Sequence, residues 1–229
     1  MFGVTVGKAT PANGGSLVLL SPDDGSLISS VGPVGYFING LEYDHVSNKL
    51  YGTTSNKDPV FPDGLIQIDM QTAAATTIGA SGMMVSNPTV NSTGEMLGFS
   101  QNSGEDTLIT FDIITGVAAT IGNPGLRLWE NGLAFDSEDT LYLVHGNGEI
   151  YTIDAADGSA TFMSSIGTRA HHGDFHPETG YYWGIDETYN SIGYSDAPRD
   201  LLVVDFNTPA IISTLSTVND LHAVTFYYD

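Results

Sequence analysis

The residues best suited to chemistry lie in short segments between apolar runs. Trp129 stands close to Arg127 and Glu130 in the segment LRLWENG. An aromatic ring beside a cation and a carboxylate can stack on a sugar or another small polar molecule and hydrogen-bond its edges. The same residues could instead close the core with the indole ring and form a salt bridge at its rim, so two interpretations stay open.

Three histidines, His171, His172 and His176, form a second cluster. Adjacent side chains of a strand point to opposite sides, so His171 and His172 are expected to diverge. HHxxxH also lacks the spacing of the helical H-E-x-x-H zinc motif. No cofactor is therefore assigned. Ca2+ is the metal ion left open, because asparagine carbonyls can bind it, although few carboxylates accompany them here.

These segments recur because the chain repeats one unit. The reference copy is NGLAFDSEDTLYLVHGNGEIYTIDAADGSATFMSSIG, residues 131–167, and related copies occupy residues 39–79 and 87–122 and the chain from His171 onward. Each copy has four short apolar runs separated by Gly, Asp, Asn or Thr, without helical periodicity. A spacing of about 40 to 50 residues is typical of four-stranded propeller blades.

The two ends of the chain complement each other. Residues 1–32 match the second, third and fourth strands of the unit, whereas HAVTF, residues 222–226, matches a first strand. Pairing them removes the unpaired edges that an open ring would leave. The sequence therefore predicts an all-β, five-bladed β-propeller with four antiparallel strands per blade. It forms one domain, 1–229, with blades at about 221–229 plus 1–34, 35–82, 83–125, 126–167 and 168–220.

Several residue types recur at fixed positions of the unit and are interpreted as structural. A carboxylate ends the third strand and can accept backbone N–H groups to start a turn. A glycine closes the fourth strand and is expected to supply an unusual backbone conformation. Aromatic side chains in the first strand are expected to pack between blades. The residues are Asp69, Asp112, Asp154 and Asp205; Gly79, Gly122 and Gly167; Tyr43, Phe135, Phe175 and Phe226.

The motifs GLAFD, TLYLV, GEIYTID and ATTIG resemble those of bacterial propeller proteins built on GLAFDPxxxTLYG followed by GxLYxIDxxTGxATxIG. YYWGID, residues 181–186, is faintly similar to YWTD repeats. The resemblance implies the fold, ligand or protein binding, and a secreted or surface-associated protein, although no signal peptide is expected in this chain. It transfers no catalytic residue.

The predicted binding site lies at one mouth of the central channel. In a propeller, the connections between blades and the loops between second and third strands emerge there together. Polar residues at the start of the first strands are expected to form a ring that holds waters, a cation or a ligand. The predicted site consists of Tyr36, Asn39, Arg127, Trp129, Glu130, Asn131, Arg169, His171 and His222.

Charge and composition exclude several partners. Six basic residues stand against 27 acidic ones, a formal net charge of −21, so the protein repels the phosphates of nucleic acids and anionic membrane surfaces. No apolar run approaches the roughly 20 residues that a membrane-spanning helix needs. Cysteine is absent, which excludes disulfides and thiol nucleophiles. A monomer is expected.

Three functions are compatible with these observations. The first is a non-catalytic binding module for a small polar ligand, a glycan or a protein. The second is a glycan-active hydrolase with carboxylates among Asp186, Glu130 and Asp174 and with His171 or His222 as acid or base, which requires a carboxylate pair in a deep pocket. The third is a structural or surface-assembly component.

Overall fold

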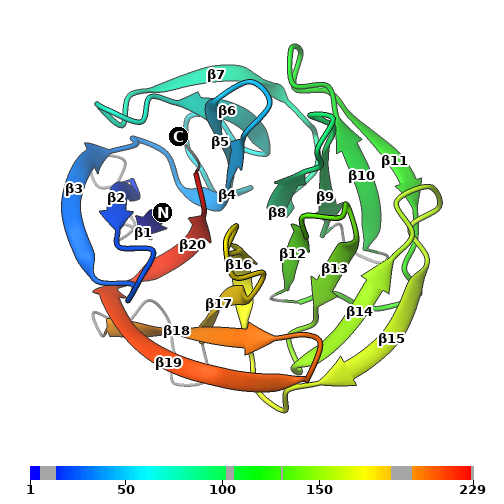
Figure 1. Ribbon diagram of the computed structural model, residues 1–229. Helices are drawn as coiled ribbons and strands as arrows, with labels where there is room; N and C mark the ends of the chain where they lie inside the picture. The colour runs from blue at the N-terminus through cyan, green and yellow to red at the C-terminus, as the bar shows by residue number, and fades with distance from the viewer. Residues whose placement is uncertain (6–13, 102–105, 130, 187–197, 228–229) are drawn as a thin grey trace.

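In a computed structural model the chain forms five antiparallel four-stranded sheets arranged as blades around a central axis (Figure 1). The structure describes residues 1–5, 14–101, 106–129, 131–186 and 198–227, and these contain no helix. Accordingly, no helix in the described ranges is long and apolar enough to cross a membrane. The prediction of an all-β, five-bladed propeller is confirmed.

Each blade runs outward from a strand at the axis. The first blade combines the chain ends: β20 (Leu221–Thr225), β1 (Phe2–Thr5), β2 (Ser16–Leu20) and β3 (Leu27–Pro33). The second contains β4 (Ile38–Asp44), β5 (Lys49–Thr54), β6 (Gly64–Ile68) and β7 (Ala75–Ala80). The third contains β8 (Val85–Val90), β9 (Met96–Ser100), β10 (Thr107–Phe111) and β11 (Ala118–Gly122). The fourth contains β12 (Gly132–Phe135), β13 (Leu141–Val144), β14 (Glu149–Ile153) and β15 (Ala160–Ser165), and the fifth β16 (His171–Phe175), β17 (Tyr182–Asp186), β18 (Pro198–Asp205) and β19 (Ala210–Asn219).

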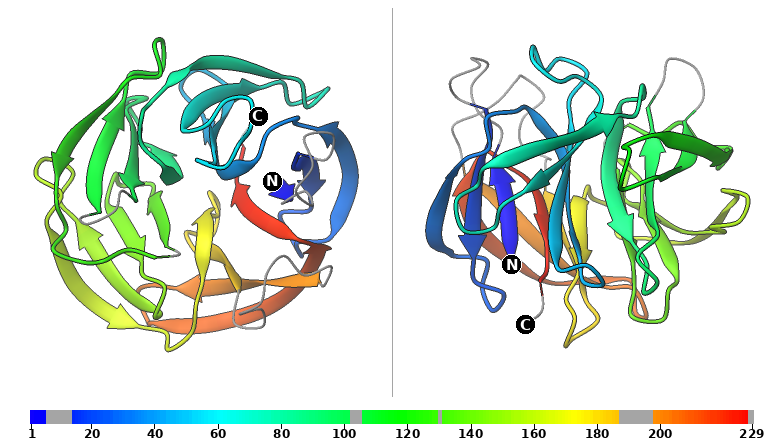
Figure 2. Two further views of the ribbon diagram at one scale, coloured as in Figure 1. Left: turned by 180° about the vertical axis from the view of Figure 1, so that it is seen from behind. Right: turned by 90° about the horizontal axis from the view of Figure 1, so that it is seen from above.

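The ring closes where β20 pairs with β1. The two strands are antiparallel, with Phe2 opposite Thr225, Gly3 opposite Val224 and Val4 opposite Ala223. Figure 2 shows β20 between the axis and β1 in both views. The strand that ends the chain thus finds its partner at the beginning of the chain, as the repeat analysis predicts.

The core consists of five apolar clusters, one in each space between neighbouring blades. Because every blade has a neighbour on both faces, its inner strands are buried on both sides, as in β9, where all five residues are buried. The outer strands lie at the rim and are largely exposed, as in β7. This arrangement accounts for the short, almost continuous apolar runs of the repeat.

The recurring Asp and Gly residues shape the outer turns. Asp69 Oδ1 accepts the backbone N–H groups of Gln71 and Thr72, the predicted turn. The interpretation of the glycines needs correction for two of them, which have no left-handed backbone. A Cβ atom at Gly79 would lie 1.8 Å from the Thr115 carbonyl oxygen of the next blade, so close approach of a neighbouring backbone, rather than an unusual conformation, demands glycine there. Gly122 is equivalent.

Removal of residues 221–229 should abolish cooperative folding. The truncation exposes two open blade faces and deletes the buried side chains of Leu221, Val224 and Phe226, worth together about 5–9 kcal/mol of burial. This is comparable to the whole stability of an ordinary domain, about 5–15 kcal/mol.

Thermal unfolding followed by circular dichroism checks this expectation. The control is a circular permutant that joins the two termini and opens the chain in the β10–β11 turn, where Ile114 is 85% exposed; it should unfold cooperatively. A truncated chain with an unchanged Tm would contradict the closure argument.

Candidate functional site

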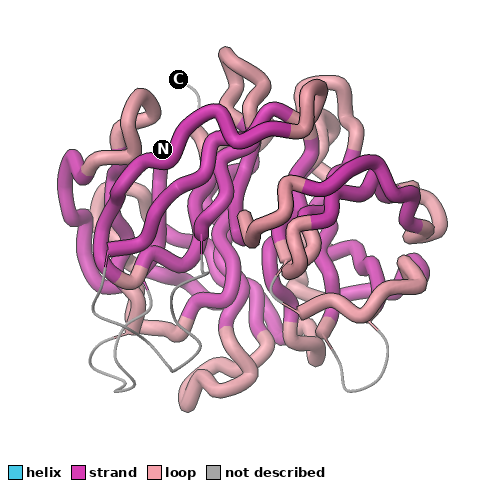
Figure 3. Tube along the Cα trace, turned by 90° about the horizontal axis from the view of Figure 1, so that it is seen from below, coloured by secondary structure: helices cyan, strands magenta, loops and turns pink. Residues whose placement is uncertain are grey.

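The central axis of the ring has two ends. We call the end that carries the connections between blades, and the loops between second and third strands, the loop face. The opposite end, with the turns that join first to second and third to fourth strands, is the turn face. Figure 3 shows the ring from the side, with loops and turns projecting from both ends.

On the loop face, part of the predicted site comes together around Trp129. The guanidinium carbon of Arg169 lies 5.0 Å from the centre of the indole ring, and the His145 ring meets the indole edge-on at 6.2 Å. His145 Nε2 is 2.9 Å from the Arg127 carbonyl oxygen. Trp129 is 46% exposed, so it is a surface residue rather than a closure of the core. Glu130 lies outside the described residues.

Most of the histidines and asparagines of the inner strands are buried, and they pack together near the axis. The rings of His171 and His172 are in contact at 4.8 Å, and those of His172 and His222 at 4.5 Å. The expectation that His171 and His172 diverge is wrong because β16 has an irregular register between His171 and Asp174 and His172 has φ +52°. Burial lowers the pKa of His172 well below its usual value and that of His222 to about 3.

The remaining predicted residues take other places. Asn131 is fully buried, and its carbonyl oxygen accepts a hydrogen bond from Asn87 Nδ2. Tyr36 packs against Phe61 in the second blade, and Asn39 is half-buried at an irregularity of β4. In the described part of the chain, no group of three or more His, Cys, Asp or Glu side chains can hold a metal ion. Calcium therefore has no located site.

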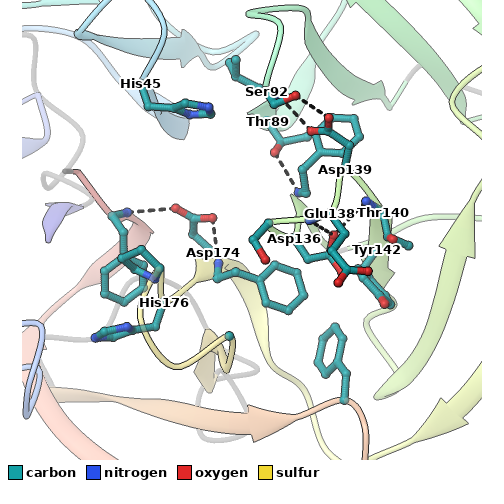
Figure 4. Close-up of a pocket in the computed structure, with 18 of the residues that line it drawn as sticks. His45, Thr89, Ser92, Asp136, Glu138, Asp139, Thr140, Tyr142, Asp174 and His176 are labelled. Atoms are coloured by element: carbon teal, nitrogen blue, oxygen red, sulfur yellow. Dashed lines mark hydrogen bonds between the residues drawn. The ribbon is translucent and has the colours of Figure 1, made fainter.

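A pocket of about 580 Å³ occupies the other end of the channel, on the turn face. It lies among the ends of the inner strands and the turns that follow them, which Figure 4 shows around an open centre. Its polar lining includes five carboxylates and two histidines, together with hydroxyl groups such as those of Thr89 and Ser92. The carboxylates and histidines are Glu42, Asp136, Glu138, Asp139, Asp174, His45 and His176.

A threonine hydroxyl connects two of these carboxylates at the inner end of the pocket. Thr225 Oγ1 lies 3.3 Å from Glu42 Oε2 and 3.2 Å from Asp174 Oδ2. Glu42 and Thr225 are buried, whereas Asp174 keeps part of its surface exposed. Two acidic groups from the second and fifth blades are thus held within reach of one hydroxyl group from the first.

The same residues belong to a ring of hydrogen bonds between blades. One position of the inner strand, occupied by Glu42, Thr89, Ala134, Asp174 and Thr225, offers a side-chain acceptor to a backbone N–H of the next blade. Val90 N donates to Glu42 at 2.9 Å, Phe135 N to Thr89 at 3.2 Å, Phe226 N to Asp174 at 2.9 Å and Tyr43 N to Thr225 at 3.1 Å. Ala134 has no acceptor, and Phe175 N donates instead to Asp174 of its own blade at 2.7 Å.

Burial makes both carboxyl groups hard to ionise. It raises the pKa of Glu42 well above the usual value, and the nearby Asp174 charge raises it further. Burial also raises the pKa of Asp174 to about 6, against the opposing effect of backbone hydrogen bonds from Phe226 and Phe175. The pair is therefore expected to keep one proton near neutral pH, on Glu42.

The sequence analysis included Asp174 as a possible carboxylate but not Glu42 or the turn-face pocket. One signal was available: the repeat position of Glu42 carries Thr89 and Thr225 in two other blades, polar residues inside otherwise apolar strands. The partnership of Glu42 with Asp174 had no such signal, because 131 intervening residues bring them together only when the ring closes.

The site and its five blades define the class of protein as a five-bladed β-propeller, and solved structures of similar shape support this. The chain matches a chain of the nidogen/laminin complex over 98% of its length and 97% of that chain, at 11% identity and a TM-score of 0.60. No family model and no curated protein matches the sequence.

Enzymes also appear among the similar structures. A gluconolactonase from Xanthomonas campestris matches over 89% of this chain and 72% of its own, at 13% identity and a TM-score of 0.54. An engineered GH43 glycoside hydrolase matches over 80% and 42%, at 10% identity and a TM-score of 0.58. Identities this low show the fold alone. They support the resemblance to propellers in general, and the assignment to proteins with GLAFD-type blades stays a prediction.

The stability of a Glu42→Gln variant should depend on pH differently from that of the parent protein. The pKa values of Glu42 and Asp174 in the folded protein exceed those of the unfolded chain, so the folded state holds more protons from about pH 4 upward. This contribution to stability is therefore greatest at low pH and falls as pH rises through about 6. The substitution removes one titrating group and keeps an oxygen for Val90 N.

Urea unfolding at pH 4, 5, 6 and 7 measures the effect. The free energy of unfolding of Glu42→Gln, relative to the parent, should increase by about 1–3 kcal/mol between pH 4 and pH 7, given about 1.4 kcal/mol per unit of pKa shift. Glu95→Gln, an exposed change on the same face, should show no such trend. A relative stability of Glu42→Gln that falls toward pH 7 would refute the assignment of raised pKa values.

Proposed function

We propose that this protein is a non-catalytic binding module and that its ligand is a small polar molecule held in the turn-face pocket. The observation that carries the proposal is a pocket of about 580 Å³ in which carboxylates, histidines and hydroxyl groups from four blades converge. Small-molecule sites commonly measure about 300–1,000 Å³ and contain a few convergent polar groups.

The lining favours a ligand rich in hydrogen-bond donors. Asp136, Glu138 and Asp139 follow one another in the β12–β13 turn and present acceptor oxygens at the rim. The aromatic rings of Tyr142 and Phe175 form one side wall of the pocket. Donor groups on a compact ligand, such as hydroxyl or amino groups, would meet acceptors on one side and ring surface on the other.

Binding is favoured over catalysis because the inner carboxylates already have structural partners. Both oxygens of Asp174 accept backbone N–H groups, and Glu42 accepts Val90 N and lies beside the Thr225 hydroxyl. Moving either group toward a substrate would break hydrogen bonds within or between blades. The hydrolase alternative keeps one specific observation in its favour, a buried pair of carboxyl groups with raised pKa values, which glycoside hydrolysis uses.

A thermal-shift screen of glycans, amino acids, amines and sugars, with and without Ca2+, tests the proposal. A ligand of the pocket should raise the Tm of the parent protein and of Glu95→Gln, but not that of Glu42→Gln, because binding to the folded state stabilises it by mass action. Equal shifts in all three proteins would place the ligand elsewhere. Turnover of chromogenic glycosides that is lost in Asp174→Asn would establish the hydrolase instead.

The loop-face residues offer a second place for a glycan or another planar polar ligand. Their support is the stacking of Arg169 on the exposed Trp129. Trp129→Ala should abolish binding at this face and leave the Tm within a few degrees of the parent value, because surface substitutions usually change stability by less than about 0.5 kcal/mol. Glycan arrays read with the parent, Trp129→Ala and Glu42→Gln proteins separate the two faces, and a glycan retained by all three proteins binds at neither face.

A further inference from the structure

The two faces of the ring differ in charge. Within the described residues, four of the lysine and arginine side chains lie in loop-face segments, namely Lys57, Arg127, Arg169 and Arg199, and only Lys49 follows a turn-face turn. Every turn-face turn within one blade contains an Asp or Glu or directly follows one. Examples are Asp23 and Asp24 after β2, Asp69 after β6, Asp112 after β10, Asp154 after β14 and Asp205 as the last residue of β18.

The pocket lies at the centre of this acidic face. None of its lining residues is a lysine or arginine, and five are carboxylates. A concave site lined by one sign of charge concentrates the field and attracts ions of the opposite sign. The pocket therefore selects for positive charge before any contact is made.

We infer that the ligand of the turn-face pocket carries a positively charged amino group, and that this group binds to the carboxyl groups of Glu42 and Asp174, which both lie beside Thr225 Oγ1. The inference rests on the proposed function and adds the chemical class of the ligand. The carboxylate pair around Thr225 Oγ1 is the place where the amino group is recognised.

An ammonium group fits this place better than a second neutral hydroxyl group does. It donates up to three hydrogen bonds and accepts none, and the exposed part of Asp174, the carboxylate of Asp136 and the rim carboxylates of Glu138 and Asp139 are acceptors. Its charge also offsets the repulsion between two ionised carboxyl groups. The pair can then lose its proton without leaving two uncompensated negative charges in a buried site.

Binding and proton release should therefore occur together. Because the amine stabilises the ionised form of the pair, its affinity should rise with pH through about 6, the pKa of Asp174. The other charged groups facing the pocket are His45, His176, Asp136, Glu138 and Asp139.

Isothermal titration calorimetry with glucosamine and glucose tests the inference, because the two sugars have nearly the same size and differ in one amino group. At pH 6.5, where its amino group is largely protonated, glucosamine should bind at least tenfold more tightly than glucose. Titrations in phosphate and in MOPS, which have different ionisation enthalpies and are not primary amines, should show release of a fraction of a proton up to one proton. At pH 5.5 the affinity for glucosamine should fall about tenfold.

Three variants connect the result to the pocket. Glu42→Gln should weaken glucosamine binding and suppress proton release, and Glu95→Gln should change neither. Glu138→Gln alters the exposed rim without touching the inner hydrogen bonds, so it serves if Glu42→Gln folds poorly; it should weaken binding about threefold, less so at high salt.

The outcomes separate the inference from the proposed function. Glucose could bind as tightly as glucosamine, without proton release but with weaker binding to Glu42→Gln. That result would overturn the inference that the ligand carries an amino group and would support the pocket as the binding site. Binding of Ca2+ that a chelator reverses and that blocks glucosamine would also overturn it in favour of a metal ion. Failure of glucosamine and 1,4-diaminobutane to bind at 10 mM (about the upper practical limit for weak ligands) would overturn it outright, while sensitivity of another class of ligand to Glu42→Gln would keep the proposed function.

Discussion

The pairing of β20 with β1 is the constraint on which the rest of the structure depends. A propeller has no central core, because its apolar side chains are divided among the spaces between blades, and each space needs a blade on both sides. The first blade lacks an inner strand until the end of the chain supplies it. Main-chain hydrogen bonds between residues 216 or more positions apart in the chain thus complete two of the five apolar clusters, those on either side of the first blade.

The closing strand also builds the candidate site. Thr225 accepts Tyr43 N from the second blade and lies beside the carboxyl groups of Glu42 and Asp174, and Phe226 N donates to Asp174. The inner end of the turn-face pocket therefore does not exist in an open chain. Stability and the candidate site depend on the same few hydrogen bonds, which explains how a pair of acidic groups is tolerated in a buried place: their acceptor oxygens complete the contacts between blades.

Charge is distributed so that the two ends of the channel differ. Four of the five turns that join third to fourth strands start with an Asp residue, because a short carboxylate accepts the backbone N–H groups of the turn. Repetition of this local device around the ring produces an acidic face. The loop face does not gain this negative charge, because its longer connections do not use the same turn. On that face Arg169 and Trp129 stack on each other. The similar structures include both binding proteins and enzymes, so the distinction must come from the site itself.

The sequence by itself determined the fold: the repeat of four apolar runs, the Asp at each outer turn and the unmatched HAVTF at the end predict a ring of five blades closed by its termini. These patterns are local and recur along the chain, so they can be recognised in the sequence alone. Tertiary structure alone decided the irregularity in β16 that turns His171 and His172 toward each other, the close backbone approach at Gly79, and the meeting of Glu42 with Asp174. The physical reason is that a strand pattern specifies which face of a sheet a side chain occupies, whereas contacts across the channel depend on the register and tilt of blades far apart in the chain.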